Sequence, residues 1–547
     1  MGRPVSNGCT GSLCRADVLF SMKNFSSADA IECASINGRE NIYFLGSFAD
    51  RISFASQQRR AIRLINAMVE EKKLHPTMKV AVVGAGIAGL TAACAAISVG
   101  CSVDIYEKGD DYCHLQAGTS RRWIHPTANF WPQEPIRHVT EFPFLNWHSA
   151  TCKKVIEQIV YGWKTYGQGN CRTFLNTTVT KLENRAETVE LYCINKFGVQ
   201  PSVIYDRVIL CVGFGFEQST SFSGTQSRSY WIDSGWDTRD FQRGRSVWIS
   251  GSGDGAFFDA LDILYSKFNE GRLVSELAIQ IDHLRKEFIR IENICDSMSK
   301  EEGDKYAHNE YLKLAEHNDV ANFLNSRLAP EGRRVTILHR SKYLLNRRPA
   351  PLHRLMIAHA LKANRIDAVW GELDINSAEA SYLPLPSGPR KRIENAIAVV
   401  VRHGATTPLR DLLGDATLKR LLASPTHCKQ EALLDMQWAH GGHEFFASRA
   451  RYRRIFPCRR GAADAWNSEI VYLVSGVLQS YNIHHGAIGC KRIRSTGEWV
   501  IEIDVPGNGP HTTLGDTFSE FFGMAIQWKL GRVSPVGFRA AEFRSAA

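Results

Sequence analysis

Residues 79–107 follow a strand–turn–helix–strand pattern that leaves few possible folds for this part of the chain. Residues 79–83 (KVAVV) form a short apolar run of the kind found in buried parallel strands. The run stops at Gly84, an Ala-rich stretch of helical composition follows, and residues 102–106 (SVDIY) form a second apolar run that ends at Glu107. Two strands joined by a helix make a βαβ unit, so the pattern predicts an α/β fold on a parallel sheet.

Three glycines, Gly84, Gly86 and Gly89, form a Gly-x-Gly-x-x-Gly turn between the first strand and the helix. Gly84 permits a tight turn, Gly86 lets the backbone approach a pyrophosphate, and Gly89 lets the helix pack closely on the sheet. The start of the helix offers unpaired N–H groups and the positive end of its dipole to the phosphates. Glu107, about twenty positions further on, can bind ribose hydroxyls and disfavours a 2′-phosphate. The pattern therefore predicts a dinucleotide site.

The same segment, KVAVVGAGIAGLTAA followed by VDIYEK, resembles the FAD-binding motif of two-dinucleotide-domain flavoproteins. That broad group includes flavin monooxygenases, amine oxidases and pyridine-nucleotide reductases. By this resemblance Gly84, Gly86, Ala88 and Gly89 hold the FAD pyrophosphate, and Glu107 holds its ribose. The resemblance implies an α/β chain with two Rossmann-like dinucleotide-binding domains, and it indicates a superfamily rather than a substrate.

A second turn of this kind follows an apolar run at residues 246–250. Gly251, Gly253 and Ala256 form Gly-x-Gly-x-x-Ala, and Ala in the third place keeps the helix close to the sheet and is common where the ligand is NADP. Asp254 would either repel a phosphate or cap the N–H groups of its own helix. The turn predicts an NAD(P)H site, with a Rossmann-like turn that binds no ligand as the alternative.

The charged residue expected about twenty positions after this turn is missing. The next apolar run, residues 334–338, follows a polar, helix-favouring stretch at about 270–330 in which Leu277 and Phe288 share one helical face. We expect a helical insertion in the second domain. Arg340 follows the strand expected at 334–338 and can bind a 2′-phosphate. The alternative is that Arg340 belongs to a solvated basic turn.

A loop rich in Arg, His and Trp lies soon after Glu107. By the same resemblance, such loops run along the FAD pyrophosphate towards the flavin ring, so Arg122 is expected to pair with phosphate. His125 and Trp131 are candidates for contact with flavin or substrate, although a histidine before a proline more often makes structural hydrogen bonds. No catalytic acid, base or nucleophile and no metal site is predicted.

The chain is expected to contain two main domains with a segment at each end. These are an N-terminal strand–helix segment (1–76) that packs on the FAD domain, an FAD-binding domain (77–243), a second, NAD(P)-binding-like domain (244–405) and a smaller C-terminal α+β region (406–547). The strand at 41–51 and the amphipathic helix at 54–72 also resemble the strand and helix that usually end FAD domains. That reading implies a permuted chain; an ordinary N-terminal strand–helix unit is the alternative.

Composition narrows the class of protein and its partners. The chain is 44% hydrophobic and 22% charged, as in globular proteins, and its net charge of +10 over 547 residues does not by itself indicate nucleic-acid binding. An Arg-rich run at 448–461 is interpreted as solvated surface, and a half-buried strand is expected at 499–505.

The uncharged stretch at 80–103 owes its apolarity to Ala and Gly, which disfavours membrane insertion. With no apolar signal segment at the N-terminus, we expect a cytoplasmic protein with no membrane or nucleic-acid partner. A protein partner could bind the helical insertion or the C-terminal region.

These patterns predict an FAD-dependent oxidoreductase that is reduced by NAD(P)H and acts on a small-molecule substrate as a monooxygenase or reductase. The fourteen cysteines form no CxxC pair, which argues against dithiol redox chemistry. Two alternatives stay open. One is a flavin oxidase of the amine or amino-acid type, for which the turn at 251–256 would be empty. The other is a non-catalytic dinucleotide-sensing or scaffold protein.

Overall fold

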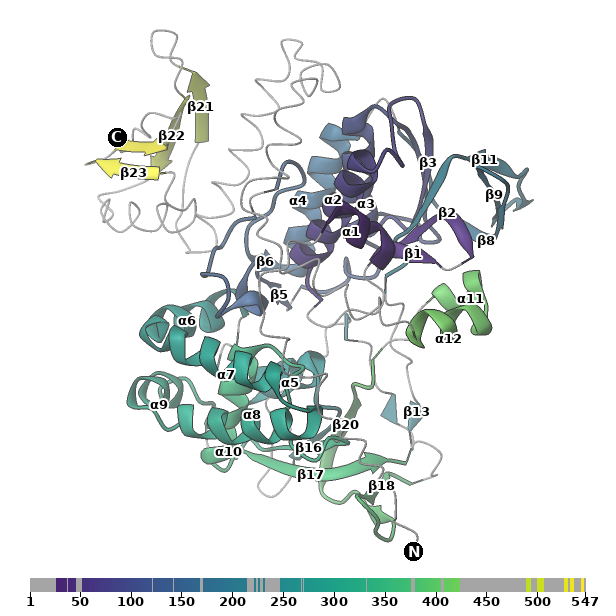
Figure 1. Cartoon of the computed structure of the whole chain (residues 1–547). Helices are drawn as coiled ribbons and strands as arrows, with labels where there is room; N and C mark the ends of the chain where they lie inside the picture. Colours follow the sequence, from purple (N-terminus) through teal and green to yellow (C-terminus); the bar gives the residue numbers. More distant parts are fainter. Residues whose placement is uncertain are drawn as a thin grey trace, which may run out of the picture.

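A computed structural model describes residues 26–423 and five short strands beyond them. Within 26–423 it leaves out residues 37, 46–51, 121, 141, 168–170, 214–220, 223–224, 227–229, 232–245, 267, 269, 331, 375–378 and 405–407. The described chain forms two α/β lobes, each built on a six-stranded sheet whose central strands are parallel (Figure 1). This confirms the predicted α/β class with two Rossmann-like units.

The first sheet has the strand order β1-β2-β12-β3-β4-β7. Its strands are β1 (Ser35–Ile36), β2 (Arg39–Phe44), β3 (Lys79–Val83), β4 (Ser102–Tyr106), β7 (Cys171–Phe174) and β12 (Arg207–Leu210). Every neighbouring pair is parallel except β1 and β2. β3 and β4 have the bounds expected from the sequence, because each is a short apolar run that a turn ends.

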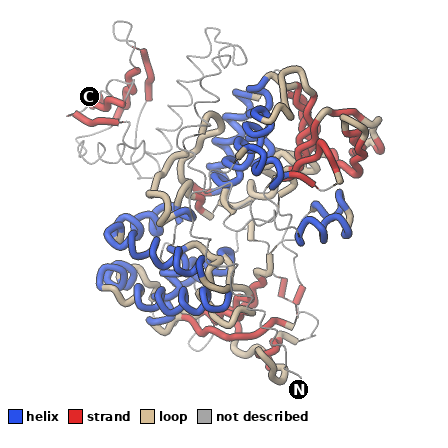
Figure 2. The backbone as a smooth tube through the Cα atoms, viewed as in Figure 1, coloured by secondary structure: helices blue, strands red, loops and turns tan. Residues whose placement is uncertain are grey.

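Helices cover one face of this sheet, and a small antiparallel sheet covers the other (Figure 2). The helices are α1 (Ser27–Ala34), α2 (Phe54–Glu70), α3 (Ile87–Val99) and α4 (Cys152–Tyr166). The antiparallel strands are β8 (Thr177–Asn184), β9 (Val189–Asn195), β10 (Gly198–Val199) and β11 (Val203–Tyr205). Two late helices, α11 (Leu409–Leu413) and α12 (Asp415–Ala423), pack on the same side as β8 and β9. The chain therefore returns to the first lobe after it has built the second.

The N-terminal strand β2 is an integral strand of the first sheet. It lies beside β12 and parallel to it, with Tyr43 opposite Ile209, and Leu45 N donates to the carbonyl oxygen of Leu210 at 3.0 Å. The amphipathic helix expected from about residue 54 is α2, and it packs with α3 in one core. β2 thus precedes the glycine motif in the sequence, but in the sheet it lies next to β12, the last of the sheet's strands in chain order. A permuted chain predicts this arrangement.

The second sheet has the order β19-β18-β17-β16-β15-β20, in which β17, β16, β15 and β20 are parallel. Its strands are β15 (Ser246–Ser250), β16 (Val335–His339), β17 (Ile366–Leu373), β18 (Ser381–Pro384), β19 (Lys391–Arg392) and β20 (Ala396–Val401). Helices α5 (Asp254–Leu264) and α10 (Pro351–Lys362) contribute to its core.

The helical insertion lies between α5 and β16, as predicted. It consists of a π-helical turn η3 (Glu270–Val274), α6 (Ser275–Gln280), a 3-10 turn η4 (Asp282–Leu284), α7 (Arg285–Ser297), α8 (Lys300–Leu314) and α9 (Asn318–Asn325). Leu277 and Phe288 are fully buried in the second core, so the helical spacing identified the correct face. The continuous spacing did not reveal the break at Ile281, where the chain passes from α6 into η4.

The remaining described elements are short. They are β5 (Trp123–Ile124), η1 (Ala128–Phe130), β6 (Ala150–Thr151), β13 (Ser221–Phe222), β14 (Thr225–Gln226), β21 (Ile488–Arg492), β22 (Trp499–Val505), β23 (Ile526–Lys529), β24 (Arg532–Pro535) and β25 (Phe543–Ser545). β22 matches the predicted strand, whereas the Arg-rich run at 448–461 lies outside the described residues.

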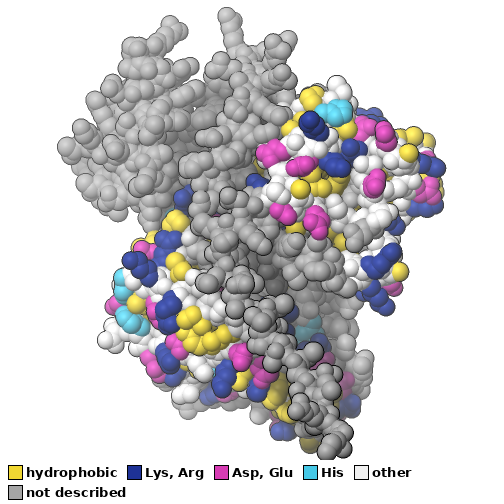
Figure 3. All heavy atoms as spheres, viewed as in Figure 1, with side chains coloured by type: hydrophobic (Ala, Val, Ile, Leu, Met, Phe, Trp, Pro, Cys, Tyr) yellow, Lys and Arg dark blue, Asp and Glu magenta, His cyan; other side chains and the backbone are white. Residues whose placement is uncertain are grey.

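Among the described residues, no helix combines the length and the apolar character needed to cross a bilayer. The uncharged stretch at 80–103 is divided among β3, α3 and β4. On the face shown in Figure 3, Lys and Arg side chains are interspersed with Asp and Glu over both described lobes.

Candidate dinucleotide sites

The first glycine turn leaves the end of β3 and is shaped by close backbone contacts. Gly84 has φ +106°, and a Cβ there would lie 2.4 Å from the carbonyl oxygen of Cys211. A Cβ on Gly89 would lie 1.9 Å from the carbonyl oxygen of Gly84, so the helix can approach the turn only without one. Gly86, the N-cap of α3, is different, because a Cβ there would meet nothing within 4 Å. Packing thus requires glycine at positions 84 and 89, whereas Gly86 leaves open space at the start of the helix.

Glu107 lies against this turn. Gly84 N donates to the carbonyl oxygen of Tyr106 at 2.7 Å, which places the next residue, Glu107, beside the turn. One carboxylate oxygen of Glu107 accepts from Ala85 N and the other from Gly109 N, both at 2.7 Å. The carboxylate is therefore held by main-chain amides at the position expected for a ribose ligand. The binding roles of the turn, of Glu107 and of Ala88, which packs partly buried against the first core, stay predictions.

The second turn repeats the plan of the first. Gly251 has φ +137°, and a Cβ there would lie 2.4 Å from the carbonyl oxygen of Arg402, which follows β20. Gly253 is the N-cap of α5, and a Cβ there would again meet nothing within 4 Å, whereas Ala256 is fully buried. In each lobe the turn contacts the residue that follows a neighbouring strand, β12 in the first sheet and β20 in the second. This neighbour lies on the side of β3 or β15 that faces away from the other strand of the βαβ unit. That is the switch point of the strand order, where ligands of doubly wound sheets bind.

Asp254 does not cap its own helix. One of its carboxylate oxygens accepts from Ala350 N at 2.8 Å and lies 3.0 Å from His353 Nδ1, at the start of α10. The carboxylate therefore ties α5 to α10, an arrangement that neither sequence expectation for this residue included.

The structure identifies the counterpart of Glu107 in the second lobe. Gly251 N donates to the carbonyl oxygen of Leu338 at 2.8 Å, as Gly84 N does to Tyr106, so His339 occupies the equivalent position. Its Nδ1 bonds the carbonyl oxygen of Ser341 at 2.6 Å, and burial lowers the pKa of the imidazole. Sequence reasoning missed His339, because the insertion separates it from the turn, although it directly follows the strand expected at 334–338. No carboxylate therefore occupies this position to repel a 2′-phosphate.

Arg340 follows His339 at the carboxyl end of β16. Its side chain is 63% exposed and is paired with the carboxylate of Glu372 from β17. Its backbone carbonyl oxygen accepts from Trp370 Nε1 at 3.2 Å. The guanidinium is thus accessible at the ligand edge of the sheet, and its contact with a 2′-phosphate stays a prediction.

Arg122 is buried between the lobes rather than free at the first turn. Its Nη2 donates to one oxygen of Asp259 at 2.8 Å, and Arg402 Nε donates to the other at 2.7 Å. Its Nε donates to the carbonyl oxygen of Tyr230, and the centroid of the Tyr230 ring lies 3.6 Å from the guanidinium carbon. Burial alone would lower the pKa of Arg122, but Asp259 raises it above the usual value. A phosphate contact stays a prediction, and in the structure the guanidinium already has a carboxylate partner.

His125 and Trp131 are both part of the packing of their loop. His125 Nδ1 accepts from Thr127 N at 3.1 Å and from Ala128 N at 3.0 Å, and its Nε2 lies 3.3 Å from His138 Nδ1. The fully buried ring of Trp131 packs edge-on against Phe288 of α7, with centroids 4.6 Å apart. These contacts support structural roles, and a contact of either residue with flavin or substrate stays a prediction.

Two glycine turns at the switch points of two six-stranded sheets, each with parallel central strands, define a protein with two Rossmann-like units. Residues 82–138 match the family of NAD(P)-binding Rossmann-like domains, a segment that includes the first turn, Glu107 and the loop with Arg122. A comparison with curated proteins found no match.

Several solved structures resemble the chain over about 60% of its length. They include a bacillithiol disulfide reductase from Bacillus cereus, with 13% identity and a TM-score of 0.33, covering 60% of this chain and 78% of that one. Another is an ornithine N-hydroxylase from Kutzneria sp. 744 with FAD, NADP+ and L-ornithine, with 10% identity and a TM-score of 0.34, covering 62% and 84%. A third is the thioredoxin reductase of T. acidophilum, with 13% identity and a TM-score of 0.29, covering 62% and 80%.

Proposed function

We propose that the chain is an FAD-dependent oxidoreductase that is reduced by NAD(P)H and acts on a small-molecule substrate. The observation that carries the proposal is the pair of matched turns, which differ in one respect. The first turn lies beside a carboxylate, Glu107, and the second beside a neutral imidazole, His339, followed by an exposed Arg340. One chain thus contains a site suited to a ribose with free hydroxyls and another suited to a ribose that carries phosphate.

The residues of the first turn fit FAD. The open space at Gly86 admits a pyrophosphate, the amides at the start of α3 can bind its oxygens, and Glu107 can exchange its main-chain partners for ribose hydroxyls. FAD, when bound, supplies hydride and electron transfer, and the protein supplies binding and orientation.

The second turn fits NAD(P)H by the same argument. Gly253 leaves the start of α5 open, and Arg340 offers a guanidinium one strand away. The carboxylate of Asp254 accepts a hydrogen bond from Ala350 N at the start of α10, so a backbone amide partly offsets its negative charge. We therefore expect NADPH to be preferred over NADH.

Anaerobic mixing of the FAD-loaded protein with each nicotinamide tests the proposal. Loss of the visible flavin absorbance on addition of NADPH is the expected result. A protein that binds FAD but is reduced by neither nicotinamide contradicts the NAD(P)H step and favours the oxidase alternative. A protein that takes up no FAD contradicts the whole proposal and leaves the non-catalytic alternative.

The substitution Arg340→Gln tests the choice of nicotinamide. Loss of a charge-assisted contact, worth about 1.5–3 kcal/mol, should raise the KM for NADPH by roughly 10-fold or more and leave the KM for NADH unchanged. Lys342→Gln is the matched control, because Lys342 is an exposed cation two residues away whose partner is Glu301 at 2.9 Å. An equal effect of Arg340→Gln on both nicotinamides would contradict the assignment.

A further inference from the structure

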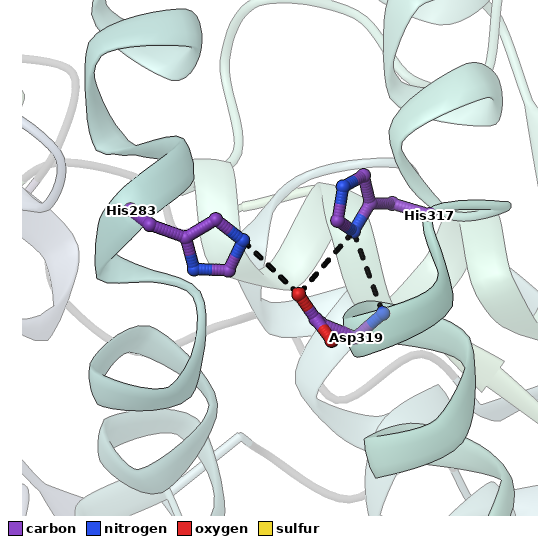
Figure 4. Close-up of side chains that lie close together, drawn as sticks. All are labelled: His283, His317 and Asp319. Atoms are coloured by element: carbon purple, nitrogen blue, oxygen red, sulfur yellow. Dashed lines mark hydrogen bonds and ion pairs between the residues drawn. The ribbon is translucent and has the colours of Figure 1, made fainter.

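Three side chains of metal-ligating type converge on the surface of the helical insertion (Figure 4). His283 comes from η4, His317 is the N-cap of α9, and Asp319 lies in the first turn of α9. Figure 3 shows histidine side chains gathered on the outer surface over this part of the second lobe. The cluster lies outside both dinucleotide turns and has no part in the function proposed above.

The geometry brings one ligand atom of each residue to a common point. His283 Nε2 lies 3.1 Å from Asp319 Oδ2, and His317 Nδ1 lies 3.8 Å from the same oxygen. All three ligand atoms lie within 4.8 Å of one another. Ligands of a tetrahedral ion with bonds of about 2.0 Å are about 3.3 Å apart, so modest side-chain rotations would complete the shell.

We propose that His283, His317 and Asp319 bind a divalent transition-metal ion of the Zn²⁺ class. Two imidazole nitrogens and one carboxylate oxygen suit Zn²⁺ and its neighbours, and are a poor set for Mg²⁺ or Ca²⁺, which prefer oxygen ligands. Three protein ligands leave the fourth position to water. The sequence pattern missed the site because the two histidines are far apart in the chain and α7 and α8 lie between them.

The contacts that the three residues make in the structure would allow a metal ion to bind. Asp319 N donates to His317 Nδ1 at 3.4 Å, a long capping bond that the metal would replace. The side chains of His283, His317 and Asp319 are 52%, 41% and 44% exposed, so an ion can reach them without unfolding the helices. A bound metal ion would link η4, which precedes α7, to α9, which follows α8. It would therefore connect the two ends of the α7–α8 pair.

Titration of the chelator-treated full chain, without a histidine tag, with ZnCl₂ tests the proposal. We expect saturable binding of one equivalent by calorimetry and a Tm that rises with the Zn²⁺ concentration, because an ion that binds only the folded state stabilises it. His283→Ala and Asp319→Asn should each weaken binding by about 10- to 100-fold or more. Without metal, both variants should unfold at nearly the wild-type temperature, since the side chains are exposed.

His114→Ala is the matched control. His114 Nδ1 lies 2.8 Å from Asp110 Oδ1 in an exposed pair of a histidine and a carboxylate, and among the described residues no third ligand joins them. This variant should bind Zn²⁺ as the wild type does. The proposal is overturned if the wild type shows no saturable binding, if His283→Ala and Asp319→Asn leave the affinity unchanged, or if His114→Ala weakens it equally. FAD content reports on the function proposed above and should not change in His283→Ala or Asp319→Asn.

Discussion

At the scale of single residues, the two turns separate glycines needed for folding from glycines that leave room for a ligand. Gly84 has a left-handed backbone conformation and lies too close to the carbonyl group of Cys211 to carry a Cβ. Gly86 has φ −76° and open space beside it. The same residue type therefore has two physical roles within three positions.

The substitutions Gly84→Ala and Gly86→Ala should have opposite consequences. Gly84→Ala combines a strained φ with a backbone clash, so it should lower the free energy of unfolding by about 2 kcal/mol or more. Gly86→Ala changes an N-cap and should cost no more than about 1 kcal/mol, yet weaken FAD binding at least about 10-fold. Urea unfolding of the two variants, together with FAD titration of Gly86→Ala, checks both parts. Equal destabilisation by the two changes would contradict the assigned roles.

At the scale of elements, the segment between β4 and α4 contains three buried histidines. Burial lowers the pKa of His138 and of His148 to about 4, with further lowering by a neighbouring histidine or lysine. Burial and the neighbouring His138 lower the pKa of His125 well below its usual value. All three rings are therefore neutral in the folded protein at pH 7.

This segment should make stability depend on pH. The unfolded chain takes up protons as pH falls below about 6.5, and the folded chain does not until about pH 4, so stability is full above pH 6.5 and falls between these values. Each buried histidine contributes a slope of up to about 1.4 kcal/mol per pH unit. His138→Gln should reduce the slope measured by urea unfolding between pH 6.5 and 4. An unchanged slope in this variant would contradict the neutral buried state.

Local patterns predicted the elements better than they predicted the contacts between elements. β3, β4 and β15 were predictable because each is an apolar run that ends at a glycine or an acid. Trp131 was a candidate ligand contact because a loop aromatic beside a predicted cofactor is plausible, but its ring is buried against Phe288, far along the chain. The position of His339 opposite the second turn could not be predicted either, because it depends on pairing across the insertion.

At the scale of the whole molecule, Asp259 joins the two lobes. It lies on α5 of the second lobe and accepts from Arg122 of the first lobe and from Arg402 after β20. All three side chains are at most 5% exposed. Two guanidinium groups thus share one buried carboxylate at the junction between the predicted FAD-binding and NAD(P)H-binding units.

The substitution Asp259→Asn should destabilise the protein as a whole. It removes the negative charge between two buried guanidinium groups, and loss of one partner of a buried ion pair costs about 3–5 kcal/mol. Glu287→Gln is the control, because Glu287 pairs with Arg290 at 2.6 Å on the surface and its loss should cost less than about 1 kcal/mol. Calorimetric unfolding of both variants measures the difference. Equal effects would show that Asp259 does not hold the lobes together.

Titration of the purified wild-type protein with FAD tests whether the first turn holds this cofactor. We expect one equivalent of FAD to bind per chain with a protein-bound flavin spectrum, and we expect Gly86→Ala to lose that binding while it keeps the fold. A wild-type protein that neither carries FAD nor takes it up, or a Gly86→Ala variant that binds FAD as tightly as the wild type, would show that the first turn does not hold this cofactor.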